Sequence, residues 1–467
     1  MASGKNKPMV FRKDETLMME IIIAMAVILG AIYLIKQRYD IKVVMFGSGI
    51  LLMLGAMVLG KSILPLDSST GLAFFDIFKV IGNLFTKQLT GASFTLMLLF
   101  GYIAYMKEIG ADLKTVSILS RPLKYVKSKG ILIVLFFLIG NALCIIIPSA
   151  SSLSVLLMAT AYPVLVYSGV SPLAVAAVIA TSATIAPTPI GADNLLASQS
   201  LNMSVTDYVF NYHAKISIPV ILIMAISHYV WQKWLDRKEE NVEPKEVFFP
   251  SEKLPNAPFI YAFLPMLPLV LMVFFHFLGS DYQLGISEVT FFSLVVSMIC
   301  EMFRQKSTTS SSTCLQTFFN GMGVGLTTVV TQVVAALTFV EGLKVLGVID
   351  LISLSVTQVA GAGLILMLIF CLLALLNGLL SGSGLALFYA FVELMPSFAM
   401  SAGISPVLLA IPMQFVSHLV KSISPVSPTV IIISSMMKIS PIQLIKRTVV
   451  PVGIGMIFSI LLSYFLL

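Results

Sequence analysis

Long runs of apolar residues recur along the whole chain, from Leu17 to its last residue. Of its 467 residues, 58% are hydrophobic and only 11% carry charge, whereas a soluble globular domain has about 25% charged residues. Runs of about 20 apolar residues are long enough for an α-helix to cross the hydrocarbon core of a bilayer. A transmembrane β-barrel would instead show short segments of alternating polarity. The sequence therefore predicts an all-α, polytopic membrane protein.

Several other classes of protein are excluded by what the chain lacks. The polar opening MASGKNKPMVFRKDET leads into an apolar run with no small-residue cleavage site behind it, so we interpret that run as a span and not a signal peptide. The net charge of +7 comes from basic residues in the loops, which does not suggest nucleic-acid binding. No HExxH, GxSxG or Walker motif occurs, so neither an enzyme nor an ATP-driven pump is predicted. The scattered cysteines predict packing and no metal site: Cys144, Cys300, Cys314 and Cys371.

The two halves of the chain carry the same motifs in the same order. A polar linker, 237–258, divides them. On each side follow an asparagine, a polar turn, a glycine, a double-proline break and a later proline. Because these matches keep their order and a nearly fixed offset, they predict an internal repeat, 1–236 against 259–467. The matched positions are Asn141 and Asn377, Gly169 and Gly403, Pro187 and Pro425, and Pro219 and Pro451.

The distribution of positive charge predicts a cytoplasmic linker. With 237–258 inside, most Lys and Arg residues fall in cytoplasmic loops, as the positive-inside rule requires. The basic N-terminal tail falls outside and disagrees with the other loops. This topology inverts the second repeat relative to the first. Inverted repeats with interrupted helices near the membrane midplane are typical of secondary transporters.

Each half contains a pair of short apolar segments joined by a small polar turn. The pairs are 131–167 and 361–400, and their tips offer Ser149, Ser151 and Ser152 in the first half and Ser381 and Ser383 in the second. Arms of about 16 residues measure roughly 24 Å as helix, which is short for a span. We predict two re-entrant hairpins whose tips bind substrate. Two short spans with tight turns remain an alternative.

Each half also interrupts an apolar helix with a pair of prolines. The predicted broken helices are 172–202, around APTPIGADN, and 404–437, around SPVSPTV. Prolines remove backbone donors, and irregular backbone persists at membrane depth only against protein or a water-filled cavity. Freed carbonyls and the hydroxyls of Thr188, Ser427 and Thr429 could then contact substrate. Proline kinks without a ligand are the alternative.

One cation lies inside a predicted membrane segment. All but one of the 29 Lys and Arg residues fall in loops, tails or segment ends, and the exception is Lys421. Such a charge is costly and by default functional, although a lysine can also snorkel to a surface. Three residues earlier, His418 could bind substrate, relay a proton or simply pack. Asp193, with Asn194 and Gly191, is either a coupling-ion site, a proton carrier or the counter-charge of Lys421.

Four stretches resemble the DcuC-type anaerobic C4-dicarboxylate carriers of the ion transporter superfamily. They are SGSGLALFYAFVELMP, ISPVSPTVIIISSMMKISPIQLIKRTVVPV, VLLMATAYPVLV and SLNMSVTDYVF. The resemblance covers most of the chain and is weakest in the first 40 residues and the linker. It implies uptake or exchange of succinate, fumarate or malate across the bacterial inner membrane. It also implies coupling to protons or sodium, an elevator-like motion and a homodimer.

The chain departs from the family pattern at the inferred site. Ser151 and Ser152 stand where the pattern has Thr-Gly, Leu385 stands for Asn, and His418 and Lys421 stand for Asn and Arg. Lysine keeps the charge of arginine but lacks its bidentate fork.

We therefore predict a secondary transporter for C4-dicarboxylates, with no cofactor beyond a coupling H+ or Na+. A carrier of another small anion or an amino acid is the first alternative, and a channel the second. The amphipathic segments 61–91 and 341–360 are expected to be arms between a fixed scaffold and a moving unit.

Overall fold

The computed structural model describes residues 9–37, 39–126, 128–238, 257–278, 284–305, 308–349, 351 and 361–467. Within these ranges the regular elements are all helices, and there is no strand. Ten of the described helices are long and apolar enough to cross a bilayer, and the number rises to eleven when the bent pair α3 and α4 counts as one span. The prediction of an all-α multi-pass membrane protein is confirmed. Most of the predicted cytoplasmic linker lies outside the described residues.

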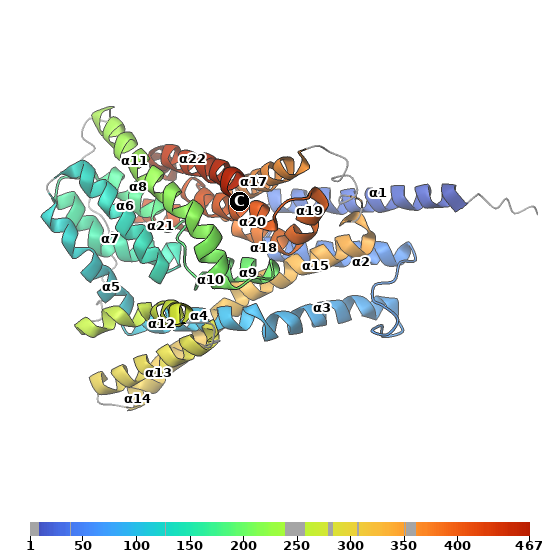
Figure 1. Cartoon of the computed structure of the whole chain (residues 1–467), viewed down its shortest axis with the longest axis horizontal. Coiled ribbons are helices and arrows are strands. Elements are labelled where there is room, and N and C mark those ends of the chain that lie inside the picture. Colours follow the sequence, from blue (N-terminus) through green and yellow to red (C-terminus); the bar gives the residue numbers. More distant parts are fainter. Residues whose placement is uncertain are drawn as a thin grey trace, which may run out of the picture.

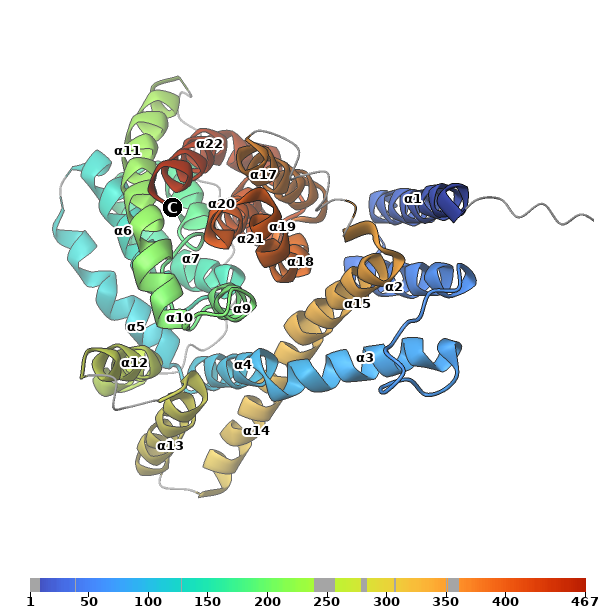
Figure 2. The same cartoon turned by 45° about the vertical axis from the view of Figure 1, so that its right-hand side comes forward.

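One group of helices, here called the flanking helices, comes from the N-terminal part of each half (Figure 1). Helices α14, η4 and α15 run end to end as one long rod across the molecule (Figures 1 and 2). Helix α2 packs along α15 and α4 along α14. The group comprises α1 (Met9–Lys36), α2 (Ile41–Val58), α3 (Ala73–Thr90), α4 (Ala92–Glu108), η3 (Phe259–Met266), α12 (Leu267–Leu278), α13 (Ile286–Gln305), α14 (Thr308–Gly325), η4 (Leu326–Val330) and α15 (Thr331–Leu346).

Glycines make the close helix contacts within this group possible. A Cβ on Gly49 of α2 would lie 2.4 Å from the backbone of Thr338 in α15. A Cβ on Gly321 of α14 would lie 2.6 Å from the Ala104 Cβ of α4. Small residues at such crossings allow two membrane helices to approach closely. Gly321 lies near the C-terminal end of α14, so the close approach of α14 to α4 occurs there.

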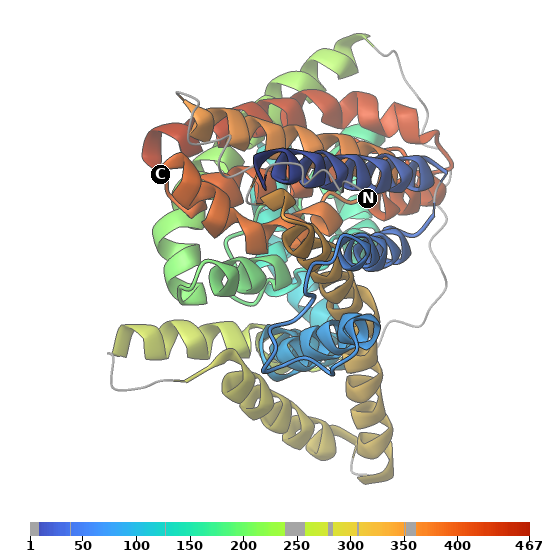
Figure 3. The same cartoon turned by 90° about the vertical axis from the view of Figure 1, so that its right-hand side faces the viewer.

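The remaining helices form a second group, here called the hairpin unit, in which both halves interleave. Helix α11 packs on α22, α22 on α8 and α21 on α7. In Figure 3 the green and red helices of this unit lie above the yellow α12 to α14. The unit comprises α6 (Lys129–Ile146), α7 (Ala150–Tyr167), α8 (Pro172–Thr181), α9 (Ala192–Ser200), α10 (Val205–Asp207), η2 (Tyr208–His213), α11 (Ala214–Lys238), α17 (Ala362–Ser381), α18 (Leu385–Phe391), η5 (Val392–Leu394), α19 (Met395–Ala402), α20 (Pro406–Leu419), η6 (Val420–Ser422), α21 (Pro428–Met437) and α22 (Pro441–Leu466). Helix α5 (Ala111–Leu119) and η1 (Arg121–Tyr125) lead from α4 into it.

The interrupted helices form the centre of the hairpin unit. In the first half α8 ends at Thr181 and the helix resumes with α9 at Ala192, and every residue from 174 to 181 is buried. In the second half α20 and η6 end at Ser422, and α21 begins at Pro428. Four helices of this unit start with Ser-Pro, where proline supplies the φ that the first helical position needs. The serines are Ser171, Ser405, Ser427 and Ser440.

A hydroxyl ties each interruption to the hairpin of its own half. The Thr188 Oγ1 donates to the Ile145 carbonyl at 2.9 Å, near the end of α6. The Ser424 Oγ donates to the Leu379 carbonyl at 3.0 Å, near the end of α17. The arms of the first hairpin, α6 and α7, have 18 residues each, or about 27 Å of helix. A helix of this length could cross the membrane, so the re-entrant course of the hairpins stays a prediction. The inverted repeat stays a prediction as well.

Candidate functional site

The tips of both hairpins open onto one cavity of about 530 Å³ between the hairpin unit and the flanking helices. Ser149 and Ser152 line it from the first tip and Ser383 from the second. The opposite wall is mostly apolar and belongs to α4 and α14, with Leu99, Phe100 and Val324 among its residues. A concave, mostly apolar cavity with a few convergent polar groups is the usual form of a small-molecule site.

Asp193, His418 and Lys421 form a chain of side chains on the wall of this cavity. The His418 Nε2 lies 2.7 Å from the Asp193 Oδ2, and the Lys421 Nζ lies 3.0 Å from the His418 Nδ1. Asp193 is in the first turn of α9, immediately after the first interruption, and Lys421 is in η6, immediately before the second. The two interruptions therefore bring an acid and a base together, with an imidazole between them.

Asp193, the acidic end of this hydrogen-bonded chain of side chains, is held by a second set of polar side chains. The Gln414 Nε2 donates to the Asp193 Oδ2 and also to the Asn194 Oδ1, the latter at 2.7 Å. The Tyr208 hydroxyl donates to the Gln414 Oε1 at 2.5 Å. Neither Gln414 nor Tyr208 was predicted from the sequence. A signal for Gln414 exists, since it lies four residues before His418 in an otherwise apolar helix and hence on the same face.

Several predicted site residues lie away from the cavity. Ser151 and Gly191 do not line it, and Thr188 and Asn194 instead close the first interruption, with the Asn194 Nδ2 donating to the Thr188 carbonyl at 2.8 Å. In the second half, Ser427 is the N-cap residue of α21 and Thr429 is buried in its first turn. These residues stabilise the backbone of the two interruptions, and none of them lines the cavity in which substrate would bind.

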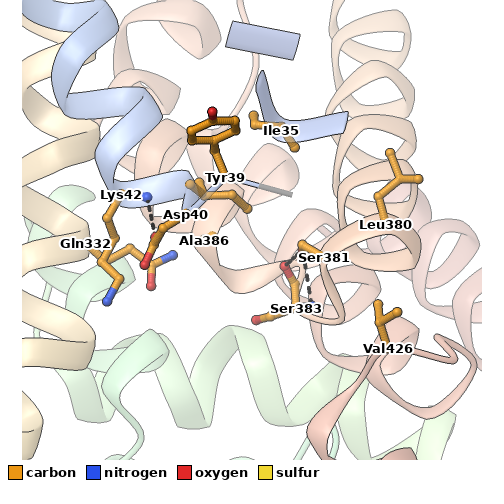
Figure 4. Close-up of a pocket in the computed structure, with 11 residues that line it drawn as sticks. Ile35, Tyr39, Asp40, Lys42, Gln332, Leu380, Ser381, Ser383, Ala386 and Val426 are labelled. Carbon is orange, nitrogen blue, oxygen red and sulfur yellow. Dashed lines mark hydrogen bonds between the residues drawn. The ribbon is translucent and has the colours of Figure 1, made fainter. Parts of the chain in front are cut away.

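Ser381 faces a second cavity, of about 360 Å³ (Figure 4). Asp40 and Lys42, at the connection between α1 and α2, line its other side. Gln332 of α15 and Ser383 line both cavities. The tip of the second hairpin thus forms part of the wall between two cavities, one containing the Asp193, His418 and Lys421 chain and one bordered by Lys42.

Close backbone packing fixes this second tip. Gly382 has a φ of 79°, a conformation that favours glycine, and ends α17. A Cβ on Gly384 would lie 2.5 Å from the Ser417 Cα of α20. The tip is therefore pressed directly against the helix that carries His418.

Lys107 and Asp112 line the first cavity outside the candidate spans or at their ends. Asp112, on α5, is buried, and burial raises the pKa of its carboxyl to about 7, against a smaller opposing effect of Lys107. Asp112 was not predicted from the sequence, because a carboxylate in the first turn of a helix is common and carries no signal of burial.

Among the residues that the structure describes, no group of three His, Cys, Asp or Glu side chains is placed to hold a metal ion. The chemistry available at the first cavity is that of two acids, Asp112 and Asp193, the His418 imidazole, the ammonium groups of Lys107 and Lys421, and several hydroxyls. Such a set can bind an anionic molecule and move protons.

The chain matches the family model described as "DcuC: C4-dicarboxylate anaerobic carrier" over residues 19–466. It is 36% identical over 442 residues to the anaerobic C4-dicarboxylate transporter DcuC of Escherichia coli K12, covering 94% of this chain and 95% of that protein. It is 34% identical over 454 residues to the probable anaerobic C4-dicarboxylate transporter DcuC of Vibrio cholerae, covering 96% and 98% of the two chains. These relatives are transporters, which confirms the prediction of a carrier and not an enzyme.

Two solved structures share the fold at low sequence identity. Neisseria gonorrhoeae MtrF, described as illuminating a class of antimetabolite efflux pumps, aligns with a TM-score of 0.61 at 14% identity over 91% of this chain and 95% of that one. The Alcanivorax borkumensis YdaH transporter, described as having an unusual topology, aligns with a TM-score of 0.62 at 16% identity over 91% and 98%. These matches establish the fold alone.

Proposed function

The chain belongs to the DcuC family of anaerobic C4-dicarboxylate carriers, and on that premise we propose that it transports succinate, fumarate or malate across the bacterial inner membrane. Transport is secondary, coupled to a cation gradient or to exchange with a second dicarboxylate. The relatives' names support the substrate class, and the polytopic fold supports a membrane carrier.

The observation that carries this proposal is the first cavity. Lys421, a cation within the hairpin unit, lines this cavity together with Ser149, Ser152 and Ser383, whose side chains carry hydroxyls. An ammonium group attracts one carboxylate of the substrate, and hydroxyls donate to the other oxygens. Small polar tips leave room for a molecule of four carbons. Asp193, Asn194 and Gly191 would serve the coupling cation.

We further propose elevator-type alternating access, in which the hairpin unit moves against the flanking helices. The cavity supports this proposal because it lies between the two groups, so that a displacement of one past the other would change its access. The amphipathic segment 61–91, which contains α3, would act as one arm; half of its proposed counterpart, 341–360, lies outside the described residues. A homodimer and a cytoplasmic linker complete the proposal.

Transport by proteoliposomes tests the proposal. Counterflow of labelled succinate is measured against a panel of C3 to C6 acids and amino acids, with and without sodium and a proton gradient. We expect saturable exchange of succinate, fumarate and malate. Exchange of another small anion or amino acid, with none of the C4 acids, would favour the first alternative. Flux that does not saturate and shows no counterflow would favour a channel.

A further inference from the structure

The hydrogen bonds of the Asp193, His418 and Lys421 chain define where its protons lie. A lysine ammonium donates hydrogen bonds and accepts none. At 3.0 Å from the Lys421 Nζ, the His418 Nδ1 therefore accepts and carries no proton. The single proton of the neutral imidazole is then on Nε2, which lies 2.7 Å from the Asp193 Oδ2 and donates to it.

Asp193 is held as a carboxylate by this arrangement. Its Oδ2 receives two N–H donors, the His418 Nε2 and the Gln414 Nε2. Hydrogen bonds donated to a carboxyl group stabilise its charged form. These three hydrogen-bonded side chains thus have a positive end at Lys421, a neutral middle at His418 and a negative end at Asp193, and the net charge of the three is zero.

The net charge around Asp193, His418 and Lys421 is no longer zero when a dicarboxylate enters the cavity. The substrate brings two negative charges next to Lys421, which already compensates Asp193 through the imidazole. His418 then lies between two carboxylates, its own partner Asp193 and that of the substrate, and an imidazole in that position favours its charged form. When Lys421 turns to the substrate, the His418 Nδ1 loses its donor and is free to bind a proton.

We propose that His418 is the proton-coupling residue of this carrier and that its Nδ1 takes up one proton with each dicarboxylate. This inference rests on the proposed function and specifies its coupling ion. The proton arrives as hydronium in the cavity water: one O–H bond of the hydronium breaks as the Nδ1–H bond forms, neutral water is left, and the imidazole becomes an imidazolium. On release of substrate the Nδ1 returns its proton to water and accepts again from Lys421.

The exposure of His418 to the cavity fits the role of proton acceptor. Both His418 and Asp193 retain exposure to the cavity, with 13% and 14% of their side chains accessible. The other histidine near Asp193, His213, is 1% exposed, packs edge-to-face against Phe415 and does not line the cavity. The titratable and charged groups that face the chain from the neighbouring elements are Asp193 of α9, Lys421 of η6, Cys144 of α6, Tyr208 and His213 of η2, Tyr389 of α18, Lys107 of α4 and Asp112 of α5.

Isothermal titration calorimetry of the purified full chain tests the proposal directly. Succinate binding is measured near pH 7.5 in buffers of different ionisation enthalpy, which gives the number of protons taken up per succinate bound. We expect about one proton for the wild type. For His418→Asn and His418→Gln, whose amides can keep a bridge without titrating, we expect less than half of that number. Asp112→Asn, at the other acid of the cavity, tests the rival proton site, and Glu341→Gln, at an ionisable side chain that does not line the cavity, is the matched control and should keep the wild-type number.

Each outcome separates the claims. Proton uptake by His418→Asn equal to that of the wild type, or its loss in Asp112→Asn alone, would overturn the role of His418. Succinate binding without proton uptake by the wild type would do the same, and this measurement needs no variant to fold. No binding of succinate, fumarate or malate would instead overturn the proposed function itself.

Discussion

At the scale of single residues, the most consequential feature is a charged pair bridged by a histidine in a membrane protein. We expect Lys421→Met to lower succinate uptake by about 10- to 100-fold, because a hydrogen bond to a charged group contributes about 1.5–3 kcal/mol. It also leaves Asp193 without its counter-charge, so the thermal unfolding midpoint in detergent should fall. The measurements are initial uptake by proteoliposomes and a thermal unfolding scan.

The double variant Asp193→Asn with Lys421→Met separates the two effects. Removing both charges should restore much of the stability, since no uncompensated charge remains, but it should not restore uptake. Normal uptake by a folded Lys421→Met variant would remove this lysine from the substrate site.

Asp112 gives a pH dependence of known sign. In the folded protein its pKa is raised to about 7 from an ordinary value of 3.8, because the carboxyl is buried. The folded state therefore holds this proton over a range in which the unfolded chain has lost it, and stability falls as pH rises through about 7. We expect the unfolding midpoint of the wild type to drop by several degrees between about pH 5 and 8. Asp112→Asn should flatten this dependence; an equal drop in both proteins would contradict the assignment.

The individual polar residues of the site could be found in the sequence, but their pairing could not. Lys421 stands out as a cation in an apolar segment, and Asp193 as an acid next to a double-proline break. Their connection through His418 depends on a contact across 225 positions of the chain. Gln414 escaped notice because a neutral amide in an apolar helix is common, and only the position of Asp193 gives it a role.

At the scale of elements, the prolines of the two interruptions predicted where the helices break, because proline acts locally on its own backbone. The long rod of α14, η4 and α15 was not predicted. No proline or charged residue marks its π-helical section, Leu326–Val330, which lies in contact with α4.

The tip of the second hairpin offers a test of packing without a change of charge. Gly384→Ala adds one methyl group, which would lie 2.5 Å from the Ser417 Cα. The backbone of Gly384, with a φ of −74°, suits alanine, so only the contact changes. Since overpacking costs about 1–3 kcal/mol, we expect a displaced tip and at least a tenfold loss of uptake. Gly453→Ala in α22, where a Cβ meets nothing within 4 Å, is the control and should transport normally.

The position of Ser383 between the two cavities gives a second test of the same element. In a background without Cys144, Cys300, Cys314 and Cys371, Ser383→Cys should react with a water-soluble thiol reagent and lose uptake. Succinate should slow the reaction, because the side chain lines the first cavity. Met400→Cys, 81% exposed on the same hairpin, should react without loss of uptake. Failure of succinate to protect Ser383→Cys would place the substrate elsewhere.

At the scale of the whole molecule, the proposed motion of the hairpin unit against the flanking helices can be arrested chemically. Ala335 and Ala336 of α15 form a buried cluster with Met45 of α2 and Ala390 of α18. The contact of α15 with α18 joins the two groups of helices, whereas that with α2 lies within the flanking helices.

In the cysteine-free background, cross-linking Ala336→Cys to Ala390→Cys should abolish uptake, and reduction should restore it. The same treatment of Met45→Cys with Ala335→Cys should leave uptake unchanged, because those helices move together. Succinate binding to the arrested protein should persist, since Lys421 and the tip serines proposed to hold the substrate all belong to the hairpin unit. Full uptake with the first pair cross-linked would show that transport needs no displacement of these groups.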